Sequence, residues 1–70
     1  MKDDYIYFEP NQLYEKGARI ITGKYIPRTA IAELNPTGDD SGTIVLLNGT
    51  VYQLSGHPAV EKVRREVEGN

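Results

Sequence analysis

The amino-acid sequence predicts a small α+β domain, in which a twisted, mainly antiparallel sheet of four or five strands packs against one C-terminal helix. The chain has 70 residues, 39% of them hydrophobic, which is enough for one core and too few for a second domain. Short runs of β-branched and aromatic residues, separated by glycine, proline and asparagine, favour strands up to residue 54. Helical spacing of apolar residues is found only after them.

The first predicted strand is residues 5–8, where alternation places Tyr5 and Tyr7 on one face and Ile6 and Phe8 on the other. Residues 11–17 favour a loop, with one helical turn around Leu13.

Two further strands are expected in the middle of the chain. Residues 18–26 form one, with a bend at Gly23, and Pro27 marks its edge or a turn because proline cannot donate to a ladder. Residues 29–34 form the next, which ends before Pro36. Residues 37–42, with Asp39 and Asp40 between glycines, have the composition of a solvated turn and lack the spacing of a calcium loop.

A β-hairpin is the clearest local signal. Asn48-Gly49 stands between apolar runs at 43–47 and 50–54, and this pair tolerates the positive φ angles of a type I′ turn. A two-residue loop sets Leu46 opposite Val51. One face of the hairpin then carries Ile44, Leu46 and Val51. The other carries Val45, Leu47, Tyr52 and Leu54, so both faces are expected to be apolar.

The helix is predicted at residues 58–68, opened by Pro58 and ended by Gly69. Val60, Val63 and Val67 form its apolar stripe, with Ala59 at the margin. Glu61 with Arg65, Lys62 with Glu66 and Arg64 with Glu68 are expected as surface pairs at i, i+4.

One helix covers only one face of such a hairpin. Either the N-terminal strands fold over the other face as a partial barrel, or a second subunit packs on it. Small domains commonly need a disulfide, a metal or a partner subunit, and this chain has no cysteine and one histidine. We therefore expect a homo-oligomer whose interface contains Ile44, Leu46 and Val51.

Residues 26–68 resemble two kinds of bacterial protein. The run Ile31-Ala-Glu-Leu34, a polar loop, the Asn48-Gly49 hairpin and a short helix are similar to small flagellar proteins of the FlbD type and to the hairpin-helix core of LytTR-type domains. The resemblance implies a strand-loop-strand-helix architecture, and the small size of the chain fits a bacterial or phage regulatory factor. The segment from Tyr5 to Tyr25 has no counterpart in it, and no functional residue is carried over.

Composition argues against catalysis and cofactors. Ser55 and His57 stand at the start of the expected helix, where helix capping explains them better than a nucleophile and its base. No metal-ligand set or phosphate-binding glycine loop is present in the sequence, so we expect a non-enzyme without a cofactor. The absence of a signal peptide or an apolar span favours a cytoplasmic protein.

Tyrosine is the unusual component, supplying 5 of the aromatic residues beside one phenylalanine and no tryptophan. Tyrosine fits half-exposed strand positions in a small sheet, which needs no binding role. It also suits protein interfaces because its large ring carries a hydrogen-bonding tip. We therefore expect a small regulatory or adaptor module that binds another protein. The alternative is a nucleic-acid or nucleotide-binding protein that uses the basic segment 14–28, which the net charge of −2 disfavours. The candidate binding residues are Tyr5, Tyr7, Tyr14, Arg19, Lys24, Tyr25 and Arg28.

Overall fold

The computed structural model describes residues 4–68 and confirms the α+β class. Its elements are β1 (Tyr5–Phe8), β2 (Leu13–Glu15), β3 (Ala18–Ile20), β4 (Lys24–Pro27), the 3-10 turn η1 (Arg28–Ala30), β5 (Ile31–Pro36), β6 (Ser41–Leu46), β7 (Val51–Ser55) and α1 (His57–Glu68). A five-stranded antiparallel sheet has the order β3-β2-β7-β6-β5, and β1 pairs with β4 in a separate two-stranded sheet.

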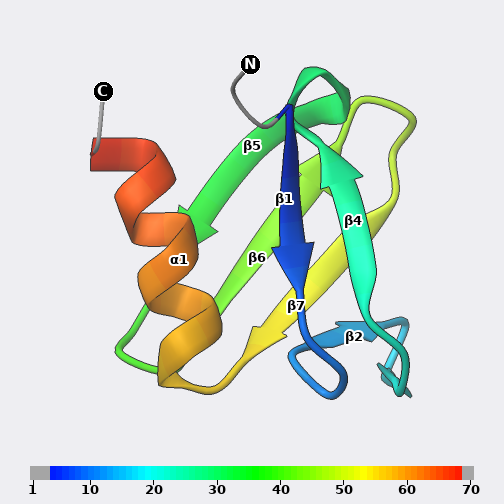
Figure 1. Cartoon of the computed structure of the whole chain (residues 1–70), viewed down its shortest axis with the longest axis vertical. Helices are drawn as coiled ribbons and strands as arrows, with labels where there is room; N and C mark the ends of the chain where they lie inside the picture. The colour runs from blue at the N-terminus through cyan, green and yellow to red at the C-terminus, as the bar shows by residue number, and fades with distance from the viewer. Residues whose placement is uncertain (1–3, 69–70) are drawn as a thin grey trace.

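The two sheets and the helix form two layers around one core. Figure 1 shows the two-stranded sheet and α1 side by side on the same face of the larger sheet. Both layers contribute to a single cluster of buried side chains, and the strands within residues 4–68 do not close into a barrel. Its members are Ile6, Phe8, Leu13, Ile26, Ile44, Tyr52, Leu54, Ala59, Val60 and Val63. β1 and β4 therefore fold over the face that the helix also covers, whereas β2 and β3 belong to the larger sheet.

One backbone hydrogen bond shows which opposed residues of the two-stranded sheet are hydrogen-bonded pairs. The Arg28 N–H donates to the Asp4 carbonyl at 2.8 Å, so that opposed pair is a hydrogen-bonded one. Because such pairs alternate in antiparallel ladders, Tyr5 opposite Pro27 and Tyr7 opposite Tyr25 are non-hydrogen-bonded pairs. The Pro27 nitrogen points away from β1. Its lack of an N–H therefore removes no hydrogen bond between β1 and β4.

The expected hairpin register is wrong by one residue. Val45 lies opposite Val51 and Ile44 opposite Tyr52. The Gly49 N–H donates to the Leu46 carbonyl at 3.0 Å, and only Gly49 in this turn has a positive φ, of 93°. The connection is thus a three-residue loop with a type I turn and a left-handed glycine, which Asn-Gly accommodates as well as a type I′ turn.

The corrected register sorts the hairpin into one apolar and one mixed face. The side chains that point into the core are Ile44, Tyr52 and Leu54. The opposite face carries the opposed pairs Val45 with Val51 and Thr43 with Gln53. The predicted interface residues Ile44, Leu46 and Val51 therefore do not share a face, and Ile44 has no exposed surface. The expectation that both faces are apolar is wrong.

The N-terminal half of the described residues contains two more strands than predicted. Residues expected as a loop form β2, which pairs with β7 on one side and β3 on the other. Lys16 and Gly17 have positive φ angles of 53° and 81° and join β2 to β3. This is the pattern of a type I′ turn, which was expected at Asn48-Gly49. The single strand expected at 18–26 is divided into β3 and β4, with Gly23 in the break.

The remaining boundaries shift by a few residues. The predicted strand at 29–34 is β5, which begins at Ile31 after η1 and includes Pro36 at its end. In α1, Ala59, Val60 and Val63 are buried, whereas Val67 is 52% exposed at the last turn. The predicted helix end at Gly69 lies outside the described residues. Between residues 4 and 68, no helix is long and apolar enough to cross a membrane.

Candidate protein-binding surface

Three tyrosines form a cluster on the outer surface of the two-stranded sheet. Tyr5, Tyr7 and Tyr25 are 52%, 37% and 66% exposed. The Tyr7 and Tyr25 rings lie 4.6 Å apart between centroids, and Tyr5 meets Tyr25 edge-on at 6.3 Å. Non-hydrogen-bonded pairs bring side chains close, which explains the short Tyr7 to Tyr25 distance. We call these three residues the tyrosine face.

Gly23 fixes the position of the Tyr7 ring. A Cβ atom at residue 23 would lie 2.3 Å from the Tyr7 hydroxyl oxygen and 2.9 Å from two ring carbons. The ring therefore lies against the backbone just before β4, in space that only glycine leaves open. The break between β3 and β4 thus has a packing reason.

Two cations bind the outer edge of β1. The Lys62 ammonium in α1 donates to the Tyr7 carbonyl and lies 5.7 Å from the Tyr7 ring centroid and 5.3 Å from that of Phe8. The Arg28 guanidinium donates to the Tyr5 carbonyl at 3.3 Å. Both carbonyls belong to non-hydrogen-bonded positions and point away from β4, so the side chains supply the partners that a neighbouring strand would supply.

Arg28 also joins the two-stranded sheet of β1 and β4, the ribbon, to the helix through Glu66. Its Nε and Nη2 donate to the two carboxylate oxygens of Glu66 at 2.9 and 2.6 Å. Hydrogen bonding to this guanidinium lowers the pKa of Glu66 below its ordinary value. The expected surface pair of Glu66 with Lys62 is replaced by this contact, because both side chains reach across to β1 and η1.

The structure brings together some of the predicted binding residues and separates others. Tyr5, Tyr7 and Tyr25 share one face, with Arg28 at the end of the same ribbon. Lys24 points the other way, with its ammonium 5.7 Å from the centroid of the buried Tyr52 ring. Tyr14 and Arg19 are cross-strand partners on the five-stranded sheet. The segment 14–28 is therefore not one continuous basic surface.

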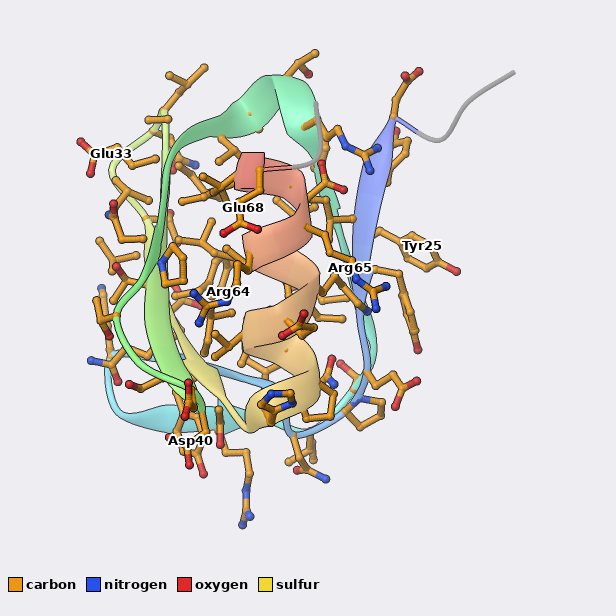
Figure 2. The ribbon with its side chains drawn as sticks, turned by 90° about the vertical axis from the view of Figure 1, so that its left-hand side faces the viewer. Tyr25, Glu33, Asp40, Arg64, Arg65 and Glu68 are labelled. Atoms are coloured by element: carbon orange, nitrogen blue, oxygen red, sulfur yellow. The ribbon has the colours of Figure 1, made fainter. Side chains whose placement is uncertain are left out.

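Sequence reasoning missed the residues that hold this surface in place. The i, i+4 spacing of Lys62 and Glu66 predicts a pair on the outer helix surface, and Gly23 predicts a bend. No local pattern relates a residue in the helix to a carbonyl 55 positions earlier. Figure 2 shows why the contacts form: α1 lies between β5 and β1, with Arg64 toward β5 and Arg65 toward β1.

A hollow lies between the last turn of α1 and β5. It has a volume of about 310 Å³ and is lined by Ile6, Ile31, Ala32, Leu34 and Val67, with Glu33 and the Arg28–Glu66 pair at its wall. In Figure 2 Glu33 projects outward from the sheet.

The residues considered for catalysis or metal binding lie apart from the tyrosine face. His57 is exposed and its Nε2 lies 3.8 Å from a Glu61 oxygen. Within residues 4–68 no group of three or more potential metal-ligating side chains occurs. The Asp39-Asp40 turn is closed by backbone bonds from Thr37 and Gly38 to the Ser41 carbonyl, at 3.1 and 3.2 Å.

No family model, curated protein or solved structure matches this chain in the three comparisons. Function is therefore inferred from the geometry of the surface.

Proposed function

We propose that this chain is a small, non-enzymatic protein-binding module whose contact surface is the tyrosine face. The observation that carries the proposal is the fixed arrangement of three partly exposed tyrosine rings on one side of a two-stranded ribbon. Tyrosine is enriched at protein interfaces and among the residues that dominate binding energy, because it combines a large apolar ring with a hydroxyl group.

Rigidity supports the same proposal. Ring contacts hold Tyr25 against Tyr5 and Tyr7, and the absence of a side chain at Gly23 leaves the space that the Tyr7 hydroxyl end occupies. A contact surface that is already ordered loses less conformational entropy on binding. Arg65 is exposed on the β1 side of α1, and none of the ion pairs found among residues 4–68 includes it (Figure 2). A surface of tyrosine and arginine has the composition of a binding hot spot.

Three of the cations near the tyrosine face are engaged by other groups, which disfavours a polyanionic ligand there although Arg65 is exposed on the β1 side of α1. Arg28 is bound by Glu66, Lys62 by the Tyr7 carbonyl, and Lys24 points toward Tyr52. A nucleic-acid site needs cations available to phosphates. The nucleic-acid or nucleotide alternative is favoured by a different observation, the pairing of Tyr14 with Arg19 on the open sheet.

Site-specific photo-crosslinking tests the protein-binding proposal. A benzophenone amino acid replaces Tyr25, and in a matched variant it replaces Leu47, which is 71% exposed in the turn between β6 and β7 and is not part of the tyrosine face. We expect a defined protein adduct in native cells from position 25 and none from position 47. The adduct should disappear when Tyr5 and Tyr7 are both replaced by serine.

Equal crosslinking from positions 25 and 47 would contradict the proposal, as would an adduct that survives loss of the other two tyrosines. Titration with labelled oligonucleotides at low salt tests the alternative, because phosphate contacts contribute most there. Binding that is lost in Arg19→Ala but kept in Tyr25→Ala would move the site to β2 and β3.

A further inference from the structure

The structure has four sheet edges, and three of them are protected against further pairing. The outer carbonyls of β1 accept from Lys62 and Arg28. β5 contains a register irregularity between Ile31 and Glu33 and ends at Pro36. β3 has only 3 residues. Cationic side chains, bulges, prolines and short strands are the devices by which proteins block edge pairing.

The outer edge of β4 differs from the others at its centre. Tyr25 belongs to a non-hydrogen-bonded pair with Tyr7, so its N–H and C=O both point away from β1. Among residues 4–68, β4 pairs only with β1, and no side-chain bond reaches Tyr25. Figure 1 shows β4 at the margin of its layer, with β1 on one side and no element of that layer on the other.

We propose that β4 pairs with β4 of a second copy of the chain, antiparallel about a two-fold axis at Tyr25. In this register the Tyr25 residues of the two copies exchange reciprocal N–H to C=O bonds. Each Gly23 N–H then meets the partner copy's Pro27 carbonyl, which also points outward. An isologous contact of this kind is the simplest route to a closed dimer. The proposal does not depend on the proposed binding of another protein.

The sequence of β4 suits pairing with itself in this register. Gly23 of one copy lies opposite Pro27 of the other, so the pyrrolidine ring faces a residue without a side chain. Lys24 stands opposite Ile26 and not opposite Lys24 of the other copy, so no like charges are directly opposed. The pairing converts a two-stranded ribbon, a type that is marginal by itself, into four strands with a continuous row of tyrosines.

Oligomeric state as a function of concentration is the first measurement. Strand addition buries less surface than a standard interface, so we expect a monomer-dimer equilibrium within the range of about 1 μM to 1 mM. Tyr25→Pro removes the outward N–H and, like Pro27, leaves every β1 to β4 bond in place. Tyr25→Ala removes the ring and keeps the N–H. We expect at least a tenfold weaker dimer for proline than for alanine, with circular dichroism unchanged.

Amide exchange of the unsubstituted chain provides a test that needs no variant. We expect the Tyr25 and Gly23 amides to exchange rapidly at low concentration and to become protected as concentration rises, while the Ile44 amide stays protected throughout. The proposal is overturned if the chain is monomeric up to about 1 mM, or if Tyr25 stays unprotected in the dimer. It is equally overturned if Val51→Lys abolishes a dimer that Tyr25→Pro leaves intact. A monomer that still crosslinks another protein from position 25 would separate the two proposals.

Discussion

Lys62, in the middle of α1, donates a hydrogen bond to the backbone carbonyl of Tyr7 in β1. The contact joins the C-terminal helix to the N-terminal strand across 55 positions of sequence. The Lys62 ammonium occupies a carbonyl on the outer edge of β1, the strand that carries Tyr5 and Tyr7. Together with the Arg28–Glu66 pair, this contact positions the ribbon against the helix.

Replacing Lys62 by methionine tests this contact, because methionine keeps most of the apolar stem. We expect a loss of about 1–2 kcal/mol in the free energy of unfolding, from a charge-assisted hydrogen bond and two cation–π contacts. Urea denaturation measures it. Arg65→Met, at an exposed position with no ion pair among the described residues, should change stability by less than about 0.5 kcal/mol.

The Arg28–Glu66 pair predicts an acid-dependent part of the stability. Because the pKa of Glu66 is lowered in the folded state, its carboxylate stabilises the fold above its unfolded pKa. That contribution is lost as pH falls through the lower, folded pKa. The two side chains are 39% and 25% exposed, so we expect less than about 1 kcal/mol.

Thermal unfolding between pH 7 and pH 3 measures this effect. Glu66→Gln should show a shallower fall in melting temperature than the unsubstituted chain, and Glu68→Gln should follow the unsubstituted chain. Identical profiles for Glu66→Gln and the unsubstituted chain would show that the pair contributes nothing to folding.

Gly42 lies where β5 and β6 approach closely over the core. A Cβ atom there would lie 2.8 Å from the Asn35 carbonyl oxygen and 3.0 Å from the Pro36 Cα, and backbone cannot move aside as a side chain can. We expect Gly42→Ala to cost about 1–3 kcal/mol. Gly38→Ala is the matched control, since its Cβ meets only the Ser41 hydroxyl. Equal stability of the two variants in urea would contradict the predicted clash.

Gly23→Ala tests whether the tyrosine face is held in position by the backbone. A Cβ atom at residue 23 displaces the Tyr7 hydroxyl, so we expect the Tyr7 to Tyr25 ring contact to be lost while the core remains folded. Ring-proton chemical shifts of the two tyrosines report the contact. Thr22→Ala, at an exposed neighbouring position, should leave these shifts unchanged.

The local elements follow from the sequence where a pattern is complete within a few residues. The alternation in Tyr5–Phe8 predicts which side chains are buried, and the valine spacing predicts α1. The hairpin exists as predicted, but Asn48-Gly49 satisfies two turn geometries with similar ease. A difference of one residue in the loop reverses the faces, so the predicted interface of Ile44, Leu46 and Val51 does not form one surface.

The candidate site shows the same division. Alternation alone places Tyr5 and Tyr7 together, because strand geometry has a period of two residues. The arrival of Tyr25 beside them depends on β4 pairing with β1, and β2 becomes a strand only because β7 lies next to it. Three-residue strands have little intrinsic stability, and pairing with distant segments determines whether they form.

Short-range geometry and burial specify the α+β class, the alternation of the first strand, the hairpin and the helix, so these features follow from the sequence. Packing in three dimensions specifies that the two-stranded sheet shares a face of the core with α1. It also specifies that Lys62 contacts the Tyr7 carbonyl and Glu66 contacts Arg28 instead of each other. Their partners are separated by 55 and 38 positions, and no local preference of the chain encodes contacts at such distances.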